Sequence, residues 1–193
     1  MARPRSEEAR EAAIGATVEL VLTLGVEGVT FEEVSNRSGV AKTTLYRHFG
    51  TKQAMVAAAA SSCFVEIATP DTGNLADDLR LIFDRFKHVE EEHRLPDLMP
   101  ALLTASGSDP ELHALVTAML EERRRPIRTA LQLAQLRGEI SKDLDLDIAL
   151  ALLIGPFVQR RMIDRGEVTP EFRDAVLEAT VAGLRATART PVG

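Results

Sequence analysis

The sequence has few of the residues on which secreted and membrane-spanning folds depend. Its 193 residues include one cysteine, one tyrosine and no tryptophan. The single Cys63 cannot form an intramolecular disulfide, which agrees with a reducing compartment. A membrane span needs about 18 consecutive apolar residues. The longest apolar run, Ile148 to Val158, has 11 residues and is interrupted by Gly155-Pro156, so a membrane span and a disulfide scaffold are both excluded.

Motifs that carry catalysis or bind metal ions are also missing. The chain has no nucleophile elbow, no phosphate-binding loop and no paired-histidine zinc motif. His88 and Glu92 have one-turn helical spacing, but His93 lies off that face, and the glutamates at 90–92 read better as a solvated helix surface. We therefore expect no enzymatic activity, no metal and no cofactor.

The composition favours helices, and the charge is distributed unevenly. The chain is 45% hydrophobic and 27% charged, with a net charge of -6. Residues 1–52 carry seven basic and seven acidic side chains, so the whole deficit lies downstream. Within this block, Val34 to Lys52 holds four basic residues and no acidic one. An acidic protein with one basic stripe would repel DNA everywhere except at that surface.

Hydrophobic periodicity and capping signals predict an all-α chain of about nine helices. Thr30 and Glu33 form a capping box, and Val29 can pack on Val34 across the first turn. A cluster of turn-forming residues at 70–74 is, by composition, the best candidate boundary between an N-terminal head and the body that follows it. We expect helices at 6–24, 30–38, 42–49, from 52 onward, 75–93, 96–105, 109–138, 145–165 and 169–188.

The stretch from Phe31 to Phe49 has the spacing of a helix-turn-helix. Gly39 stands at its ninth position, where a tight corner between two helices needs glycine. Four apolar residues are spaced to meet between the helices, namely Val34, Val40, Leu45 and Phe49. Hydrogen-bond donors suited to a major groove share the opposite stripe, namely Lys42, Thr43, Tyr46 and Arg47. Lys52 begins the next helix, where a cation opposes the helix dipole, gains nothing from the fold and suits a nearby phosphate.

At these residues the chain resembles the TetR family of transcriptional regulators, whose heads carry the pattern Gly-Val-x-x-x-Thr-Leu-Tyr-x-His-Phe-x-x-Lys. The pattern runs here from Gly39 to Lys52, and it departs from many members at Ala41, where a serine caps their helix. The resemblance implies phosphate contacts from four residues, namely Thr30, Tyr46, His48 and Lys52. It also implies that base edges are met early in the recognition helix, by Lys42, Thr43, Thr44 and Arg47.

The resemblance extends to the body through Leu152–Arg161 and Thr169–Val176, which look like one TetR-family regulatory domain type. It implies a DNA-binding domain at residues 1–52 and a helical regulatory, ligand-binding and dimerisation domain at 53–193. The last two helices, about 145–165 and 169–188, would pair with those of a second subunit. Such a homodimer presents its two recognition helices to major grooves about 34 Å apart, or a multiple of that distance.

The body is also the expected place for a small ligand. Pro126 and Pro156 fall inside long helical patterns, and the kinks or freed carbonyls that they cause leave room between helices. The resemblance implies an effector pocket in this region. Ordinary core packing is the alternative role for each apolar side chain there. The residues expected to line the pocket are Phe64, Phe83, Phe86, Met99, Leu103, Met119 and Phe157.

The predicted function is that of a cytoplasmic, dimeric repressor that an unidentified small molecule releases from a palindromic DNA operator. An activator, or a repressor without an effector, is the alternative within the same class. A helical ligand- or partner-binding protein with a vestigial DNA-binding head is the alternative from another class. The basic stripe argues against the vestigial head, which would have little need for Lys42, Tyr46, Arg47 and Lys52 together.

Overall fold

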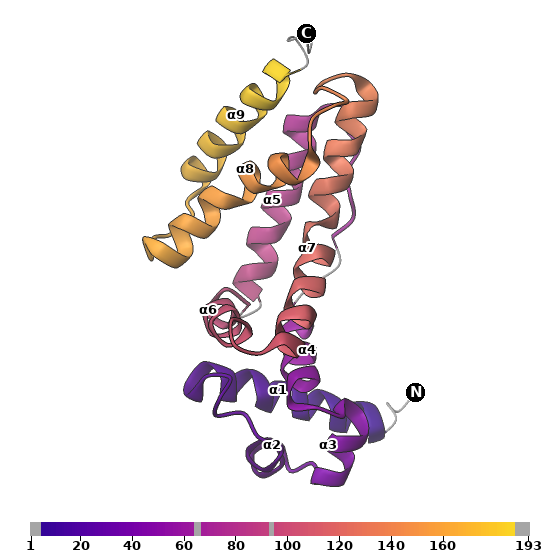
Figure 1. The fold of residues 1–193 in the computed structure, drawn as a ribbon, viewed down its shortest axis with the longest axis vertical. Coiled ribbons are helices and arrows are strands. Elements are labelled where there is room, and N and C mark those ends of the chain that lie inside the picture. Colours follow the sequence, from indigo (N-terminus) through magenta and orange to yellow (C-terminus); the bar gives the residue numbers. More distant parts are fainter. Residues whose placement is uncertain (1–4, 64–66, 93–94, 188–193) are drawn as a thin grey trace. The chain divides into compact units, whose positions relative to one another are not determined.

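The computed structural model describes residues 5–63, 67–92 and 95–187, without the side chains of residues 5, 87–92 and 95–96. Every regular element in these ranges is a helix, which confirms the all-α prediction (Figure 1). The α-helices are α1 (Arg5–Leu24), α2 (Phe31–Ser38), α3 (Lys42–Phe49), α4 (Lys52–Ser62), α5 (Leu75–Glu92), α6 (Leu95–Ser106), α7 (Pro110–Arg137), α8 (Leu146–Val158) and α9 (Pro170–Thr187).

The helix ends follow local capping chemistry. The Thr30 hydroxyl accepts a hydrogen bond from the Glu33 N–H (3.1 Å), which confirms the predicted start of α2. The Thr51 hydroxyl caps α4 in the same way. Ala41, the residue before α3, provides no side-chain cap, as its departure from the serine of many family members predicts. These caps satisfy N–H groups that the first turn of a helix leaves without a partner.

The chain divides into two compact units, each with its own apolar core. The first comprises Met1–Val65 and Val89–Glu122, and the second comprises Glu66–His88 and Arg123–Gly193. In the first unit α1 contacts α2, α3, α4 and α6, so the helix-turn-helix belongs to a larger body of helices. The predicted division at residue 52 concerns function, and it stays a prediction.

The second unit buries faces of α5, α7, α8 and α9 in one cluster. Helix α7 continues through Pro126, and α8 continues through Pro156 as far as Val158. The residues predicted to extend that helix to about 165 instead form a π-helical turn, Gln159–Ile163. The Asp164 N–H bonds to the carbonyl of Gln159, five residues earlier. The predicted helix is therefore present but ends in a wider turn.

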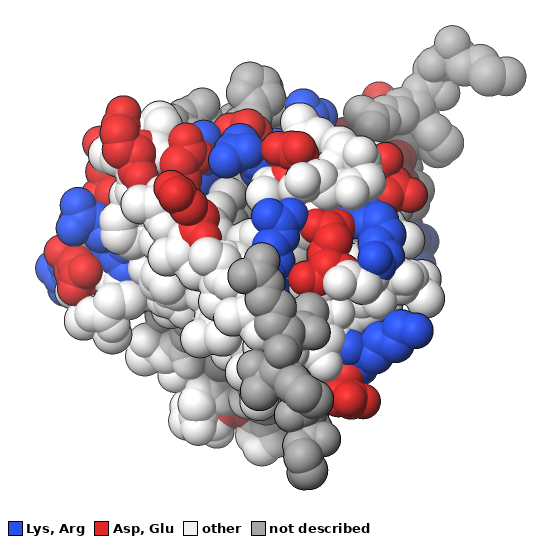
Figure 2. Space-filling view, turned by 90° about the horizontal axis from the view of Figure 1, so that it is seen from above, with Lys and Arg blue, Asp and Glu red and all other residues white. Residues whose placement is uncertain are grey.

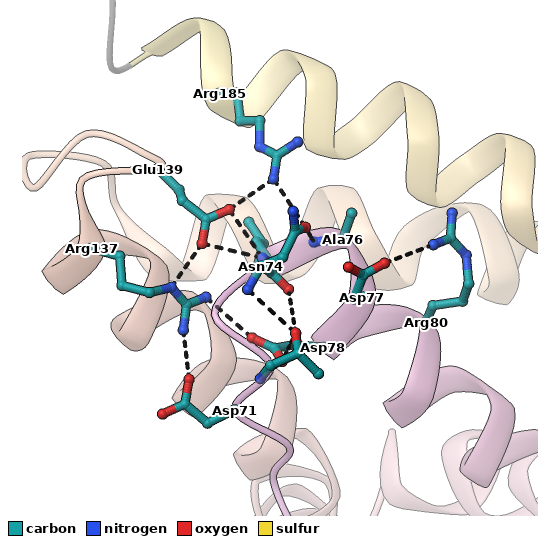
Figure 3. Close-up of polar contacts among 11 residues, drawn as sticks. Asp71, Asn74, Ala76, Asp77, Asp78, Arg80, Arg137, Glu139 and Arg185 are labelled. Atoms are coloured by element: carbon teal, nitrogen blue, oxygen red, sulfur yellow. Dashed lines mark hydrogen bonds and ion pairs between the residues drawn. The ribbon is translucent and has the colours of Figure 1, made fainter.

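A network of charged side chains joins the first turn of α5, the end of α7 and the last turns of α9 (Figure 3). Asp78 on α5 is fully buried, and its carboxylate accepts from the Arg137 guanidinium (3.1 Å) and from the N–H and hydroxyl of Thr72. Glu139 accepts from Arg137 (2.8 Å), from Arg185 (2.7 Å) and from the Leu75 N–H (3.0 Å). Each carboxylate thus has several donors, as a buried charge requires.

Hydrogen bonding decides the ionisation of Glu139. Desolvation by burial acts to raise the pKa of this carboxyl, but donors from Leu75, Arg185 and Arg137 together bring the pKa below its ordinary value. A carboxyl whose pKa is lowered in the folded state stabilises the fold above its unfolded pKa, and this stabilisation is lost as the pH falls through its folded pKa. The network therefore holds the second unit together at neutral pH.

The same substitution at two neighbouring aspartates, Asp77 and Asp78, tests how much this network contributes to stability. Asp78→Asn is expected to lower the free energy of unfolding by about 2 kcal/mol, because it replaces a buried carboxylate oxygen by an amide NH2 among the donors of Thr72 and Arg137. Asp77→Asn removes only an exposed ion pair with Arg80, and its effect should stay below about 0.5 kcal/mol. Urea denaturation at one fixed protein concentration measures both variants. Equal losses would contradict the role given to Asp78.

Candidate nucleic-acid interface

The corner between α2 and α3 is built from backbone conformation and one serine. Gly39 has φ of 72°, and its N–H donates to the Ser35 carbonyl (2.9 Å). The Ser38 hydroxyl donates to the Val34 carbonyl (2.6 Å) and accepts from the Val40 N–H (3.2 Å). The left-handed residue ends α2, and the serine bridges both sides of the turn. The predicted place of glycine in the corner is confirmed.

The two helices share the small core that the spacing predicts. Val34 and Leu45 are fully buried, and Val40 and Phe49 are nearly so. All four belong to the apolar cluster of the first unit, together with side chains of α1 and α4. Burying one leucine side chain stabilises a fold by about 1.5–3 kcal/mol. The core therefore fixes the rotation of α3, and with it the stripe that faces out.

The opposite stripe of α3 is exposed. Lys42, Thr43 and Arg47 are exposed, and 55% of Tyr46 is accessible. Thr44 is half-buried on the flank of this stripe. The structure thus brings the predicted base-contacting donors to one surface, with no large apolar side chain among them.

Acidic side chains already accompany part of the basic stripe. The Lys42 ammonium lies 3.2 Å from a carboxylate oxygen of Glu32 on α2. The Arg37 guanidinium lies 3.6 Å from a carboxylate oxygen of Glu19 on α1. Among the described residues, Arg47 has no such acidic partner. The count of four uncompensated cations therefore overestimates the charge of this surface, since folding places outside carboxylates beside it.

Lys52 makes a contact that the sequence argument did not foresee. Its ammonium donates to the backbone carbonyl of Glu27 (3.2 Å), in the segment that joins α1 to α2. The inference that this lysine gains nothing from the fold is therefore wrong. Its side chain is half-buried and tied to the loop that precedes the Thr30 cap. Its role as a phosphate contact stays a prediction.

Thr30 precedes α2, and His48 belongs to the last turn of α3. The Thr30 side chain is exposed, and the bond that its oxygen accepts from Glu33 leaves its own hydrogen available to a phosphate. His48 is half-buried, with its Nε2 3.4 Å from the Ser6 hydroxyl of α1. Each of these two residues thus has a local contact within the head.

The start of α4 is tied to the start of α7 by two polar contacts within the first unit. The Thr51 hydroxyl donates to Glu111 (2.8 Å), and the Gln53 amide donates to Asp109 (2.7 Å). Asp109 also accepts from the Leu112 N–H at the first turn of α7. The Gln53 donor first, and then this N–H, hold the pKa of Asp109 below its ordinary value. Sequence reasoning missed these contacts, because they join residues far apart in the chain.

The residues predicted to line an effector pocket fall into two clusters. Phe83, Phe86 and Phe157 belong to the second unit, where the ring of Phe83 lies 5.8 Å from that of Phe86 and 4.8 Å from that of Phe157, centroid to centroid. Met99 and Met119 pack in the core of the first unit. The remaining two are Leu103, which is 40% exposed on α6, and Phe64, which lies outside the described residues.

No group of three or more histidine, cysteine or carboxylate side chains among the described residues has the arrangement of a metal site. The side chains of His88, Glu92 and His93 lie outside that description. None of the described helices has both the length and the hydrophobicity that crossing a membrane requires.

Two family models match the chain. The model of bacterial regulatory proteins of the tetR family matches residues 13–59, which include α2 and α3. The model of the tetracyclin repressor-like C-terminal domain matches residues 69–180. The matched ranges place the helix-turn-helix in the first model and α5 to most of α9 in the second.

Individual proteins agree with these models. The HTH-type transcriptional regulator YdeS of Bacillus subtilis is 28% identical over 97% of this chain and 96% of its own length. The crystal structure of the TetR family transcription regulator SCO0332 is 29% identical, with a TM-score of 0.67 over 91% of this chain and 98% of that one. The tetracycline repressor protein class C of Escherichia coli is 37% identical over 71 residues, which cover 37% of this chain and 32% of that protein.

Proposed function

Because this chain belongs to the TetR family of DNA-binding transcriptional regulators, we propose that it is a dimeric, cytoplasmic repressor that a small molecule releases from a palindromic operator. The observation that carries the proposal is the exposed face of α3. This face presents hydrogen-bond donors on a helix whose rotation is fixed by a buried core and a left-handed corner. Donors on a rigid helix are what direct readout in a major groove requires.

The roles of the individual donors follow from their positions. We propose that the early residues of α3 meet base edges and that residues at the borders of this face hold phosphates. The proposed base contacts are Lys42, Thr43, Thr44 and Arg47. The proposed phosphate contacts are Thr30, Tyr46, His48 and Lys52. Phosphate contacts fix the register of a helix in the groove, and base contacts supply sequence preference.

The charge of one further face and the net charge of the chain support a single DNA-binding face. On the face drawn in Figure 2, lysine and arginine side chains are interspersed with aspartate and glutamate, and its described part carries no broad basic area. The chain as a whole is acidic, with a net charge of -6. Because the rest of the protein is acidic and repels DNA, DNA is directed toward the DNA-binding head.

Selection of bound duplexes from a random library, followed by affinity measurements across salt concentrations, tests DNA binding. We expect an enriched palindrome and a steep salt dependence, because each neutralised phosphate contributes about 0.9 to the slope of log affinity against log salt. The double variant Tyr46→Ala, Lys52→Ala should bind that duplex at least about a hundredfold more weakly, because hydrogen bonds to charged groups contribute about 1.5–3 kcal/mol each.

Lys142→Ala is the matched control, because it removes one exposed cation from the second unit. It should bind the selected duplex as the parent does. A folded, dimeric double variant with parental affinity would disprove the assigned contacts. Weak binding by the parent, with no enriched motif, would favour a ligand- or partner-binding protein with a vestigial head.

Exposed apolar residues support dimerisation through the last two helices. Ile148 and Leu152 of α8 are 56% and 52% exposed, and they share one face because they lie four residues apart. The exposed positions of α9 are mostly small, namely Ala175, Ala179, Ala182, Gly183 and Ala186. Small residues on one helix allow close approach by another. We propose that these faces, within about 145–165 and 169–188, form the homodimer interface.

Leu152→Asp tests this interface. A charge in the middle of the apolar face is expected to convert the dimer into a monomer of 21.1 kDa, since buried unpaired charges are strongly unfavourable. Leu136→Asp is the control, because Leu136 of α7 is 77% exposed but lies outside the proposed faces. Sedimentation equilibrium measures both masses. Dimers in both variants, or monomers in both, would refute the assignment.

An aromatic cluster in the second unit supports an effector site there. The ring of Phe157 lies near those of Phe83 and Phe172, and the Arg123 guanidinium lies 4.8 Å from the centre of the Phe86 ring. We propose that an apolar effector binds beside Phe83, Phe86 and Phe157, and that it binds the DNA-free conformation more tightly. The proposed contacts of Phe64, Met99, Leu103 and Met119 have less support, because none of them belongs to this cluster.

A panel of apolar small molecules, with and without a carboxylate, tests the effector site against the selected duplex. An effector is expected to weaken operator binding about 5–150-fold, the usual range of allosteric coupling. Phe157→Ala should lower this response while leaving the affinity without effector unchanged. If no compound changes operator affinity, the chain is better described as a regulator without an effector.

A further inference from the structure

The exposed ring of Tyr46 lies on the ring of Phe31. The two centroids are 4.0 Å apart, and the ring planes are inclined by 23°, so the rings are stacked. Tyr46 belongs to the recognition helix α3, and Phe31 is the first residue of α2. The contact therefore joins the two helices of the helix-turn-helix. It restrains the side chain of Tyr46, which its 55% exposure would otherwise leave free to move.

Phe31 is itself held in place from two directions. It follows the Thr30 cap, whose hydroxyl accepts from the Glu33 N–H, so the backbone of this turn is fixed. Its half-buried side chain packs against the apolar core of the first unit. One face of an anchored ring is thus available as a platform for the tyrosine.

From this geometry we infer that Phe31 is a positioning residue for DNA binding, which orients the Tyr46 side chain before the operator arrives. The inference rests on the proposed function and deepens it, because it assigns a role to a residue that need not touch DNA. A stacked neighbour selects one of the staggered conformers that an exposed tyrosine would otherwise exchange among. Binding then no longer has to order this ring, which improves affinity.

Glu32, the next residue of α2, also contacts a side chain on the exposed face of α3. The Glu32 carboxylate lies 3.2 Å from the ammonium of Lys42, one turn before Tyr46 on the same stripe of α3. Two consecutive residues of α2 therefore hold two side chains of the proposed DNA face. The ion pair is exposed at both ends and is correspondingly weak. The ring stack is the stronger constraint of the two.

The size of the expected effect follows from the freedom that the stack removes. Restricting one side chain to one of about three rotamers changes an equilibrium roughly threefold. An unstacked tyrosine that prefers another conformer in the free protein raises the upper limit to about tenfold, since that preference must be overcome on binding. We therefore expect Phe31→Leu to weaken operator binding about three- to tenfold. Phe31→Tyr keeps a ring at this position and should retain the parental affinity.

The composition of the chain provides a direct probe of the stack in the free protein. Tyr46 is the only tyrosine, and the chain has no tryptophan, so the tyrosine band of the near-ultraviolet circular dichroism spectrum reports this ring alone. Phe31→Leu should reduce this band toward that of a freely rotating tyrosine. Leu22→Ala is the control, because Leu22 is also partly buried against the same core but is not the stacking partner of Tyr46. It should leave the band intact.

A double-mutant cycle then connects the stack with DNA binding. The affinity of the selected duplex is measured for the parent, Phe31→Leu, Tyr46→Ala and the variant that carries both changes. If Phe31 acts through Tyr46, its substitution should change affinity less than about twofold once Tyr46 is alanine. A role limited to stability of the head would lower affinity equally in both backgrounds.

The outcomes separate this inference from the proposed function. A reduced tyrosine band, with an affinity loss confined to the Tyr46 background, supports the positioning role. An unchanged band, or an equal loss in both backgrounds, overturns that role while the parent still binds its operator. A parent that binds no enriched duplex overturns the proposed function and, with it, the role of Phe31 in DNA binding.

Discussion

A left-handed residue between α2 and α3 determines how the two helices of the head meet. At φ of 72°, Gly39 ends α2 and turns Val40 into the core. A Cβ added at this glycine would meet no atom within 4 Å, so the requirement is conformational and not one of space. Once the corner is set, Leu45 and Phe49 must face inward, and the period of the helix carries Lys42 and Tyr46 outward. The outward stripe is therefore a consequence of what is buried.

Contacts made by α4 extend this order beyond the helix-turn-helix. Thr51 caps α4 and also donates to Glu111, and Gln53 donates to the aspartate that caps α7. The same few residues thus begin one helix and hold the beginning of another. Helix α7 contributes residues 110–122 to the first unit and 123–137 to the second.

Here the sequence predicts contacts between residues that are close in the chain, and it does not predict contacts between distant residues. Helices α2, α4 and α9 begin where a threonine precedes the first turn, since a cap is a contact between residues three apart. Three other contacts join different elements, and no local pattern specifies them. They are the ion pair between Glu32 and Lys42, the ring stack between Phe31 and Tyr46, and the hydrogen bond from Lys52 to a loop carbonyl. Apolar side chains were also assigned to one pocket although they pack in two clusters, because periodicity identifies a buried face but not its partner.

The same limit applies to charge, and it changes how the DNA-binding surface works. A count along the chain treats the stripe as four free cations, whereas Lys42 and Arg37 each have a carboxylate partner within 4 Å. A phosphate that approaches Lys42 must compete with Glu32, so the electrostatic gain at this position is smaller than that of an isolated lysine. Neutral donors such as Thr43 and Tyr46 lose nothing in this way. Their contribution depends on orientation, and the Phe31 ring that stacks on Tyr46 is a contact that restrains orientation without adding a charge.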